Sequence, residues 1–266
     1  MIRIAHLSDI HFGGENVAAV AAVAEALRAS PADLTVVSGD LTQFAERHEF
    51  EAAAQWLSTI PGPRLVCPGN HDSPYLAWWE RFFSPFGRFR TAIGPVDPQS
   101  HLSPGLAVRG INTARGVQPR ANWSKGQISP AQTRAALSWF AQAPADALKV
   151  VVCHHPLVEM IGGPMTGKVW GGEAAAQALA QGGVDLVLSG HIHAPFVWPY
   201  PYGDGCSHAV GAGTLSVRER GVPPGFNLIE AGETEISIIA LAWTGSHFEP
   251  SRTWAVDRRQ HNARPG

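Results

Sequence analysis

The chain repeats one local pattern five times, in which a run of apolar, β-branched residues is followed at once by a short polar segment. The polar segments are Asp9-Ile10-His11, Gly39-Asp40, Gly69-Asn70-His71-Asp72, His154-His155 and Gly190-His191-Ile192-His193. Each repeat is typical of a short buried strand that stops at a turn. Because open α/β sheets bind their ligands at the carboxyl ends of strands, the pattern predicts a metal site assembled from five loops at one edge of a sheet.

The donor atoms of these segments restrict the kind of metal. With Asp72 set aside, two aspartates, one asparagine and up to six histidines offer oxygen and imidazole nitrogen, and no thiolate is among them. This mixture favours Mn, Fe, Co, Ni or Zn. Calcium and magnesium prefer oxygen ligands alone, and iron–sulfur clusters or structural zinc prefer cysteine.

The number of candidate ligands predicts two ions. Asp9 and His11 are two residues apart, as are His191 and His193, which places each pair on one side of an extended segment. A single ion uses about four to six ligands, fewer than these segments supply. Two ions that share a carboxylate would use the whole set. Asp40 is the expected bridge, because it is the only carboxylate that stands alone in its segment.

The motifs D-x-H, G-D, G-N-H-D, H-H-P and G-H-x-H, in this order over residues 9 to 193, resemble those of the calcineurin-like metallophosphoesterases. A closer resemblance is to the bacterial branch of cyclic-nucleotide and glycerophosphodiester phosphodiesterases. It is carried by residues 6–12 (His-Leu-Ser-Asp-Ile-His-Phe), by Lys125-Gly126-Gln127-Ile128, and by Gln132 with residues 136–140. The resemblance implies an α/β fold, a four-layer αββα sandwich of two mixed sheets flanked by helices.

The resemblance also implies roles for individual residues. The first metal would be held by Asp9, His11, Asp40 and His193, and the second by Asp40, Asn70, His154 and His191. His71 would bind no metal but would face the scissile ester as an acid or electrostatic clamp. The related purple acid phosphatases carry a metal-binding tyrosine three residues after the G-D aspartate. This chain has Gln43 there, so we expect no tyrosinate-bound ferric site.

The remaining polar residues of the motifs have more ordinary interpretations. His155 either orients a ligand or packs under the site, and Asp72 either pins its turn or supports the neighbouring histidine. We interpret His6 as structural, because it lies on the other side of its strand from Leu7 and Asp9. Histidines outside the motifs are interpreted as surface or hydrogen-bonded groups; they are His48, His101, His208, His247 and His261.

Length and composition indicate one enzyme-sized domain. The chain has 266 residues, of which 45% are hydrophobic and 16% charged, enough for a single α/β domain over residues 1–250. We expect a cap insert at 73–105 and a polar tail at 251–266. No apolar run approaches the roughly twenty residues of a membrane span. The first strand itself supplies candidate ligands, so we expect that it is not a cleaved signal peptide, and scattered cysteines (Cys67, Cys153, Cys206) favour a reducing cytoplasm.

Periodicity and capping residues predict the main elements. Helices are expected over 17–29 after the cap Asn16, from Ala45 to Pro61, and over 173–181. Short strands are expected at 208–211, 225–231 and 235–243, and we expect no element from Thr244 onward.

Residues 73–104 contain many aromatic side chains mixed with arginines. The helical spacing of Trp78 with Phe82, and of Trp79 with Phe83, predicts that most of them pack in a core under a cap, although some could line the substrate pocket. Trp78 is one candidate for substrate contact. Lys168 and Trp170, in the glycine-rich stretch after H-H-P, are the others.

These observations predict a metal-dependent phosphodiesterase. The two ions outweigh the charges of Asp9 and Asp40, so the site attracts phosphate, and a metal-bridging hydroxide would attack phosphorus in line. We expect a small diester of cyclic-nucleotide or glycerophosphodiester type as the substrate. A homodimer is compatible with the sequence. A phosphomonoesterase, a nuclease and a non-catalytic scaffold are the alternatives. The net charge of −2 and pI near 6.6 argue against long nucleic acid as a partner.

Overall fold

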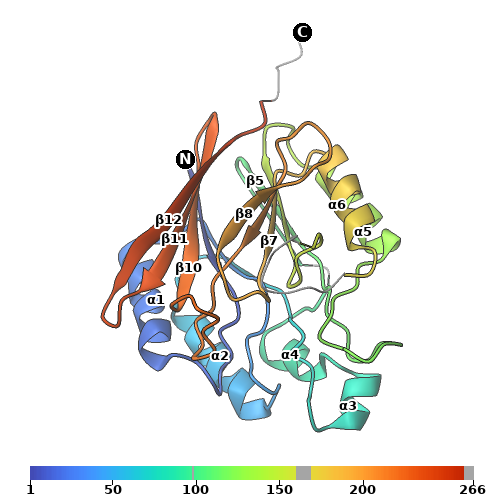
Figure 1. Cartoon of the computed structure of the whole chain (residues 1–266), viewed down its shortest axis with the longest axis vertical. Coiled ribbons are helices and arrows are strands. Elements are labelled where there is room, and N and C mark those ends of the chain that lie inside the picture. The colour runs from blue at the N-terminus through green and yellow to red at the C-terminus, as the bar shows by residue number, and fades with distance from the viewer. Residues whose placement is uncertain (98, 160–168, 261–266) are drawn as a thin grey trace.

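The computed structural model describes residues 1–97, 99–159 and 169–260. Within them, two six-stranded sheets pack face to face with helices on both outer sides (Figure 1). The first sheet has the order β12-β11-β10-β1-β2-β3, where β1 is Ile2–Leu7, β2 Leu34–Val37, β3 Arg64–Val66, β10 Gly225–Ala231, β11 Glu235–Trp243 and β12 Phe248–Asp257. The second has the order β4-β5-β6-β7-β9-β8, where β4 is Gln99–Ser103, β5 Leu106–Gly110, β6 Leu148–Val152, β7 Leu186–Ser189, β8 Phe196–Pro199 and β9 His208–Gly211.

Both sheets are mixed, as the resemblance implied. In the first sheet β1, β2 and β3 are parallel, while β10, β11 and β12 are antiparallel neighbours beside them. In the second sheet β5, β6, β7 and β9 are parallel, and antiparallel β4 and β8 form the two edges. The prediction that all five polar segments follow strands of one sheet is wrong, because β1 to β3 pair in one sheet and β6 and β7 in the other.

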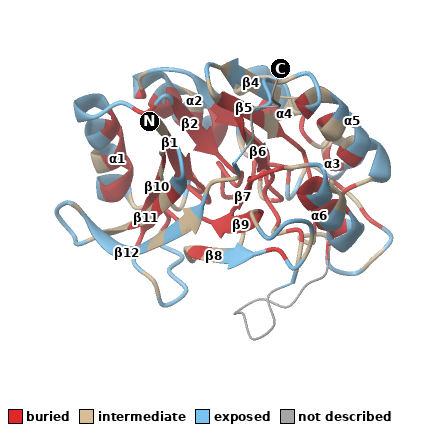
Figure 2. Cartoon of the chain, turned by 90° about the horizontal axis from the view of Figure 1, so that it is seen from above, coloured by how far each residue is buried: buried red, intermediate tan, exposed pale blue. Residues whose placement is uncertain are grey.

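The helices complete the four layers. They are α1 Val17–Ala29, α2 Arg47–Thr59, α3 Trp78–Phe83, α4 Gly87–Ala92, α5 Pro130–Phe140 and α6 Gly172–Gln181. Helices α1 and α2 cover the outer face of the first sheet, and α5 and α6 cover that of the second (Figure 2). A third apolar cluster fills the space between the sheets. The predicted four-layer sandwich is therefore confirmed.

Strand β1 illustrates how alternation builds these layers. Ala5 and Leu7 belong to the cluster under the helices, whereas Ile4 belongs to the cluster between the sheets. His6, which alternates with Leu7, is fully buried and hydrogen-bonds through Nε2 to Ser38 Oγ at 3.0 Å. It therefore has the structural role that we expected.

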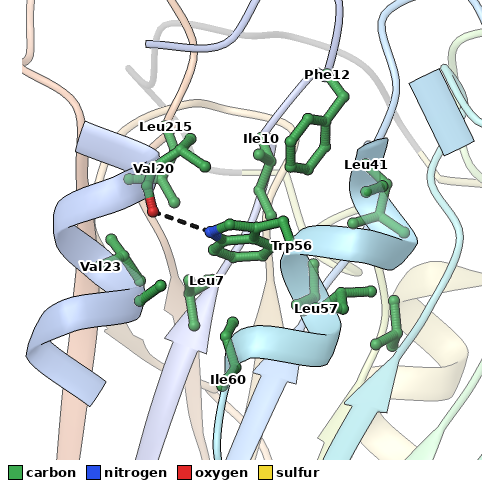
Figure 3. Packing of buried hydrophobic residues seen from close by; sticks show 14 of the residues in the cluster. Leu7, Ile10, Phe12, Val20, Val23, Leu41, Trp56, Leu57, Ile60 and Leu215 are labelled. Atoms are coloured by element: carbon green, nitrogen blue, oxygen red, sulfur yellow. Dashed lines mark hydrogen bonds between the residues drawn. The ribbon is translucent and has the colours of Figure 1, made fainter. Parts of the chain in front are cut away.

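Local sequence signals account for the helix positions. The side chain of Asn16 caps α1 by accepting a hydrogen bond from the Ala19 amide, and Ser129 caps α5 in the same way. Trp56 of α2 donates a hydrogen bond from Nε1 to the Val20 carbonyl of α1 at 2.9 Å, amid apolar side chains of both helices and of the sheet (Figure 3). The helices expected around residues 17–29, 45–61 and 173–181 and the strands at 208–211, 225–231 and 235–243 are confirmed.

Two expectations are wrong. No element was expected after Thr244, yet β12 pairs along β11 and continues the sheet through residue 257, so the start of the expected polar tail is a strand. Because most side chains of this edge strand are exposed, its sequence lacks the apolar alternation from which a strand could be predicted. The aromatic residues of α3 were expected in a core, but Trp78, Trp79, Phe82 and Phe83 are 60–79% exposed. Phe86 and Phe89, further along, are buried.

Residues 73–105 contribute α3 and α4 and then enter the second sheet as β4. Helices α3 and α4 lie together at one end of the sandwich (Figure 1). None of the helices in the described ranges is long and apolar enough to cross a membrane. All three cysteines are free thiols, and Cys67 and Cys153 are buried.

Candidate dimetal centre

The five polar segments come together where the two sheets meet. Three contacts join them, one within the second sheet and two between the sheets. The amide of Gly190 donates to the carbonyl of His154, the amide of His191 donates to Asp9 Oδ2, both at 2.9 Å, and Nδ1 of His154 donates to the Ser38 carbonyl at 3.0 Å. The loops after β1, β2, β6 and β7 are therefore held as one unit.

Candidate metal ligands are close to one another in this unit. Among the described residues, four groups of three have ligand atoms within 4.8 Å of one another; they are Asp9/His11/His193, Asp9/Asp40/His154, His11/Asp40/His71 and His154/His155/His191. All five of Asp9, His11, Asp40, His154 and His193 are buried. Asn70, 5% exposed, completes the set from the loop after β3.

Asp40 lies between two histidines that the resemblance assigns to different ions. Its Oδ2 is 3.2 Å from His154 Nε2 and 3.9 Å from His11 Nε2. Its Oδ1 accepts a hydrogen bond from the His71 amide at 2.8 Å. Burial alone would raise the pKa of Asp40, but the charges of His154 and His71 lower it well below its usual range. This carboxylate therefore stays ionised.

The backs of two histidines are held by main-chain carbonyls. Nδ1 of His154 donates to Ser38, and Nδ1 of His193 donates to Arg218 at 3.0 Å. This tautomer leaves a lone pair on Nε2, as in histidines that bind metal. Each Nε2 lies 3.2 Å from a carboxylate oxygen, on Asp40 and Asp9 respectively. Two acceptors this close need a proton or a cation between them.

The raised pKa of His154 also indicates that this site favours positive charge. Burial alone lowers its pKa, but the charge of Asp40 and a hydrogen bond to it raise the pKa to about 9. The pKa of His193 is raised for the same reasons by Asp9. In addition, Oδ1 of Asn70 is buried without a hydrogen-bond partner among the described residues, which costs about 1–3 kcal/mol unless a cation satisfies it. The residues present therefore fit a metal centre.

The backbone at the site is strained. Five of the candidate ligands have positive φ angles; they are Asp9 (52°), His11 (54°), Asp40 (51°), His191 (70°) and His193 (64°). This left-handed region is sparsely populated by residues other than glycine and is typical of functional sites. Gly39 approaches the site so closely that a Cβ there would lie 2.6 Å from His154 Nδ1. Gly39, with φ of 111°, therefore needs glycine for conformation as well as for space, whereas Gly190 of the G-H motif needs it for space, because a Cβ there would clash with Ser8.

His71 is anchored beside the ligands. Its Nδ1 donates to the Gln43 carbonyl at 2.7 Å, so Gln43 contributes its main chain to the site. Its ring meets that of His11 edge-on at 4.8 Å and stacks on Tyr75 at 5.9 Å. Nε2 of His71 makes no hydrogen bond within the described ranges, so this nitrogen is available to a proton or to a bound ligand.

His155 and Asp72 support the site through hydrogen bonds. Nδ1 of His155 is 2.9 Å from Thr113 Oγ1, and its Nε2 donates to the Ser124 carbonyl at 2.7 Å. Both ring nitrogens are thus engaged, which argues against His155 as a ligand although it lies near His191. The carboxylate of Asp72 accepts hydrogen bonds from the amides of Gly69 at 2.8 Å and of Thr42 at 2.9 Å, so it pins the turn that carries Asn70.

The three candidate substrate contacts lie in different places. Trp78 lines a cleft beside Asn70, together with Arg81 and Trp123. Trp170 is 40% exposed, and the guanidinium of Arg120 lies 4.5 Å from its ring. Lys168 lies outside the described residues. Trp123 was missed in the sequence, because it lies outside the motifs and is brought to the cleft only by the folding of the chain.

Comparisons with known proteins agree with this site. The profile of the calcineurin-like phosphoesterases matches residues 2–195. The glycerophosphodiester phosphodiesterase GpdQ of Enterobacter lignolyticus is 36% identical over 81 residues, or 26% of this chain and only 29% of that protein. A probable cyclic nucleotide phosphodiesterase of Synechococcus sp. is 26% identical over 209 residues, or 74% of this chain and 75% of that protein.

Solved structures share the fold at low sequence identity. A purple acid phosphatase, PPD1 of yellow lupin, has a TM-score of 0.70 at 12% identity, with 97% of this chain and 54% of that chain covered. A dimetal phosphatase from Danio rerio has a TM-score of 0.67 at 10% identity, with 96% and 98% covered. These likenesses show the fold alone. Because the family profile spans all five polar segments, the chain belongs to the calcineurin-like phosphoesterases, which are metal-dependent phosphoester hydrolases.

Proposed function

We propose that this protein hydrolyses small phosphodiesters, of cyclic-nucleotide or glycerophosphodiester type, at a dinuclear metal centre. The observation that carries the proposal is the position of Asp40, whose Oδ2 faces both His154 and His11. A carboxylate in this position could help to hold two ions, and two-metal enzymes use such a pair of ions for displacement at phosphorus. The names of the two sequence relatives favour a diester substrate over a monoester.

The proposed ligands divide into two sets. The first ion would take one carboxylate and two imidazoles besides the bridge, and the second an amide oxygen and two imidazoles besides the bridge. The sets are Asp9, His11, Asp40 and His193 for the first ion, and Asp40, Asn70, His154 and His191 for the second. Bound there, two divalent ions would supply positive charge for the phosphoryl oxygens and an activated water as nucleophile.

The chain itself contributes orientation and a proton. The carbonyls of Ser38 and Arg218 hold Nδ1 of His154 and His193, so that Nε2 of each ring would be free to bind an ion. His71 stands next to the bridge and would protonate the leaving oxygen. Because its Nδ1 donates to Gln43, only the imidazolium form carries a proton on Nε2. Acid help from His71 therefore requires the protonated ring.

Metal reconstitution tests the proposal. Protein stripped of metal should be loaded with Mn, Fe, Co, Ni or Zn, and its metal content and its turnover of bis(p-nitrophenyl) phosphate and p-nitrophenyl phosphate measured. We expect two equivalents of metal and a higher kcat/KM for the diester. A higher kcat/KM for the monoester would replace the proposal with a phosphomonoesterase. Protein that binds no metal and hydrolyses neither ester would be a scaffold.

A further inference from the structure

A cleft beside Asn70 is lined by aromatic side chains from two segments of the chain. It has a volume of about 430 Å³, and its walls include Tyr75, Trp78, Arg81 and Trp123. The first three follow the loop of Asn70, whereas Trp123 comes from the connection between β5 and α5. Because Asn70 is a proposed metal ligand and also lines the cleft, a group attached to a phosphate at the ions can extend into it.

Arg81 holds this aromatic wall together. It is only 7% exposed, and its Nε donates to the Gly116 carbonyl at 2.8 Å while Nη1 donates to Pro74 at 3.0 Å. Its guanidinium carbon lies 5.6 Å from the centre of the Tyr75 ring and 5.5 Å from that of Trp123, within the range of cation–π attraction. The rings are therefore positioned before any ligand arrives.

The aromatic rings extend from the cleft to the reaction site. Trp78 and Trp123 both line the cleft, and their rings meet edge-on at 5.9 Å. Tyr75 stacks on His71 at 5.9 Å with an angle of 26° between the rings. A ligand in the cleft would thus lie next to the side chain that we assign to protonate the leaving oxygen.

The lining selects a particular kind of group. Trp78 is 62% and Tyr75 is 47% exposed, so apolar ring surface is available for stacking. Among the described residues, none that lines the cleft carries a negative charge, and the buried cation Arg81 stands in the wall. A cationic headgroup such as choline or ethanolamine would meet like charge there and gain no counter-ion. A planar, neutral ring with hydrogen-bond acceptors would gain stacking and polar contacts.

We propose that this cleft is a base-binding subsite, in which Tyr75, Trp78 and Trp123 stack on the nucleobase of a nucleotide diester. The proposal rests on the phosphodiesterase function above and chooses nucleotide over glycerol diesters as its substrates. Its volume of about 430 Å³ falls in the range of about 300–1,000 Å³ that is usual for small-ligand sites.

Binding and turnover should be measured separately on the metal-loaded protein. Calorimetry would compare adenosine 5′-monophosphate with glycerol 3-phosphate, and kinetics would compare adenosine 3′,5′-cyclic monophosphate with glycerophosphoethanolamine. The variants are Trp78→Ala and Trp123→Ala. The matched control is Trp79→Ala, which lies on the same helix α3, is 79% exposed and does not line the cleft. Thermal unfolding would show whether each variant is folded.

We expect the wild type to bind the nucleotide at least about tenfold more tightly than glycerol 3-phosphate. Each cleft variant should weaken nucleotide binding and raise KM for the cyclic nucleotide by about tenfold, with kcat and glycerol 3-phosphate binding little changed. Trp79→Ala should behave as the wild type does. Because Trp78 is largely exposed, its variant keeps the test valid even if Trp123→Ala fails to fold.

The outcomes separate this proposal from the proposed function. Equal binding of the two monophosphates, or nucleotide binding that neither cleft variant weakens, would overturn the base-binding subsite even if diesters are hydrolysed. Conversely, tight nucleotide binding that the cleft variants weaken, in a protein that hydrolyses no diester, would keep the subsite and refute the phosphodiesterase.

Discussion

Replacing His71 by alanine should separate chemistry from metal binding. The amide of His71, which donates to Asp40 Oδ1 at 2.8 Å, belongs to the main chain and survives the change. What disappears is the ring, with its hydrogen bond to the Gln43 carbonyl and its contacts with His11 and Tyr75. The variant should therefore bind as much metal as the wild type does.

The expected loss is in kcat. General acid help contributes about 10²- to 10⁴-fold, which corresponds to about 3–5 kcal/mol of transition-state stabilisation. Because Nδ1 of His71 donates to Gln43, the proton on Nε2 exists only in the imidazolium. The alanine variant lacks the ring that would carry this proton, so it cannot supply it to the leaving oxygen.

The assay compares leaving groups in the metal-loaded enzymes. A p-nitrophenolate leaves without protonation, so the loss of kcat should be small for p-nitrophenyl esters and large for alkyl esters. The control is His247→Ala. The ring of His247 is exposed and pairs with Glu249, and neither residue belongs to the proposed site. Equal losses for both kinds of ester, or a loss of bound metal from the His71 variant, would refute the acid role.

Three further changes test the site and the core. Asp40→Asn should weaken both ions and lower turnover by several orders of magnitude, and two retained ions with near-normal turnover would contradict the bridge. Trp56→Ala should lower the free energy of unfolding in urea by about 3–5 kcal/mol, because it empties a packed site and breaks the bond to Val20 (Figure 3). Burial lowers the pKa of His6 to about 3. In the unfolded chain His6 becomes protonated below about pH 6.5, whereas in the folded protein it stays neutral until the pH is much lower. Between pH 7 and pH 5 the free energy of unfolding of the wild type should therefore fall by about 2 kcal/mol more than that of His6→Gln.

The candidate ligands could be predicted because each lies directly after a strand with a strong local signal. An apolar run followed by Asp9 or by His191 reports both the strand and its end, and parallel pairing then gathers the ends. The engagement of both nitrogens of His155 could not be predicted, because its partners Thr113 and Ser124 lie about 30 to 40 residues away without any motif. The sheet edge at β12 was missed because its side chains are mostly exposed.

The order of motifs by itself determined the family, the kind of donor atoms and the layered α/β class, since these depend on local runs of residues and on residue chemistry. Only the tertiary structure decided that the five loops come from two sheets, that the carbonyls of Ser38 and Arg218 orient the histidines, and that Trp123 meets Trp78 in the lining of one cleft. Main-chain carbonyls are the same at every residue, and an aromatic side chain fits a core as well as a cleft. Their roles depend on which distant segment packs against them, which is a property of the folded chain.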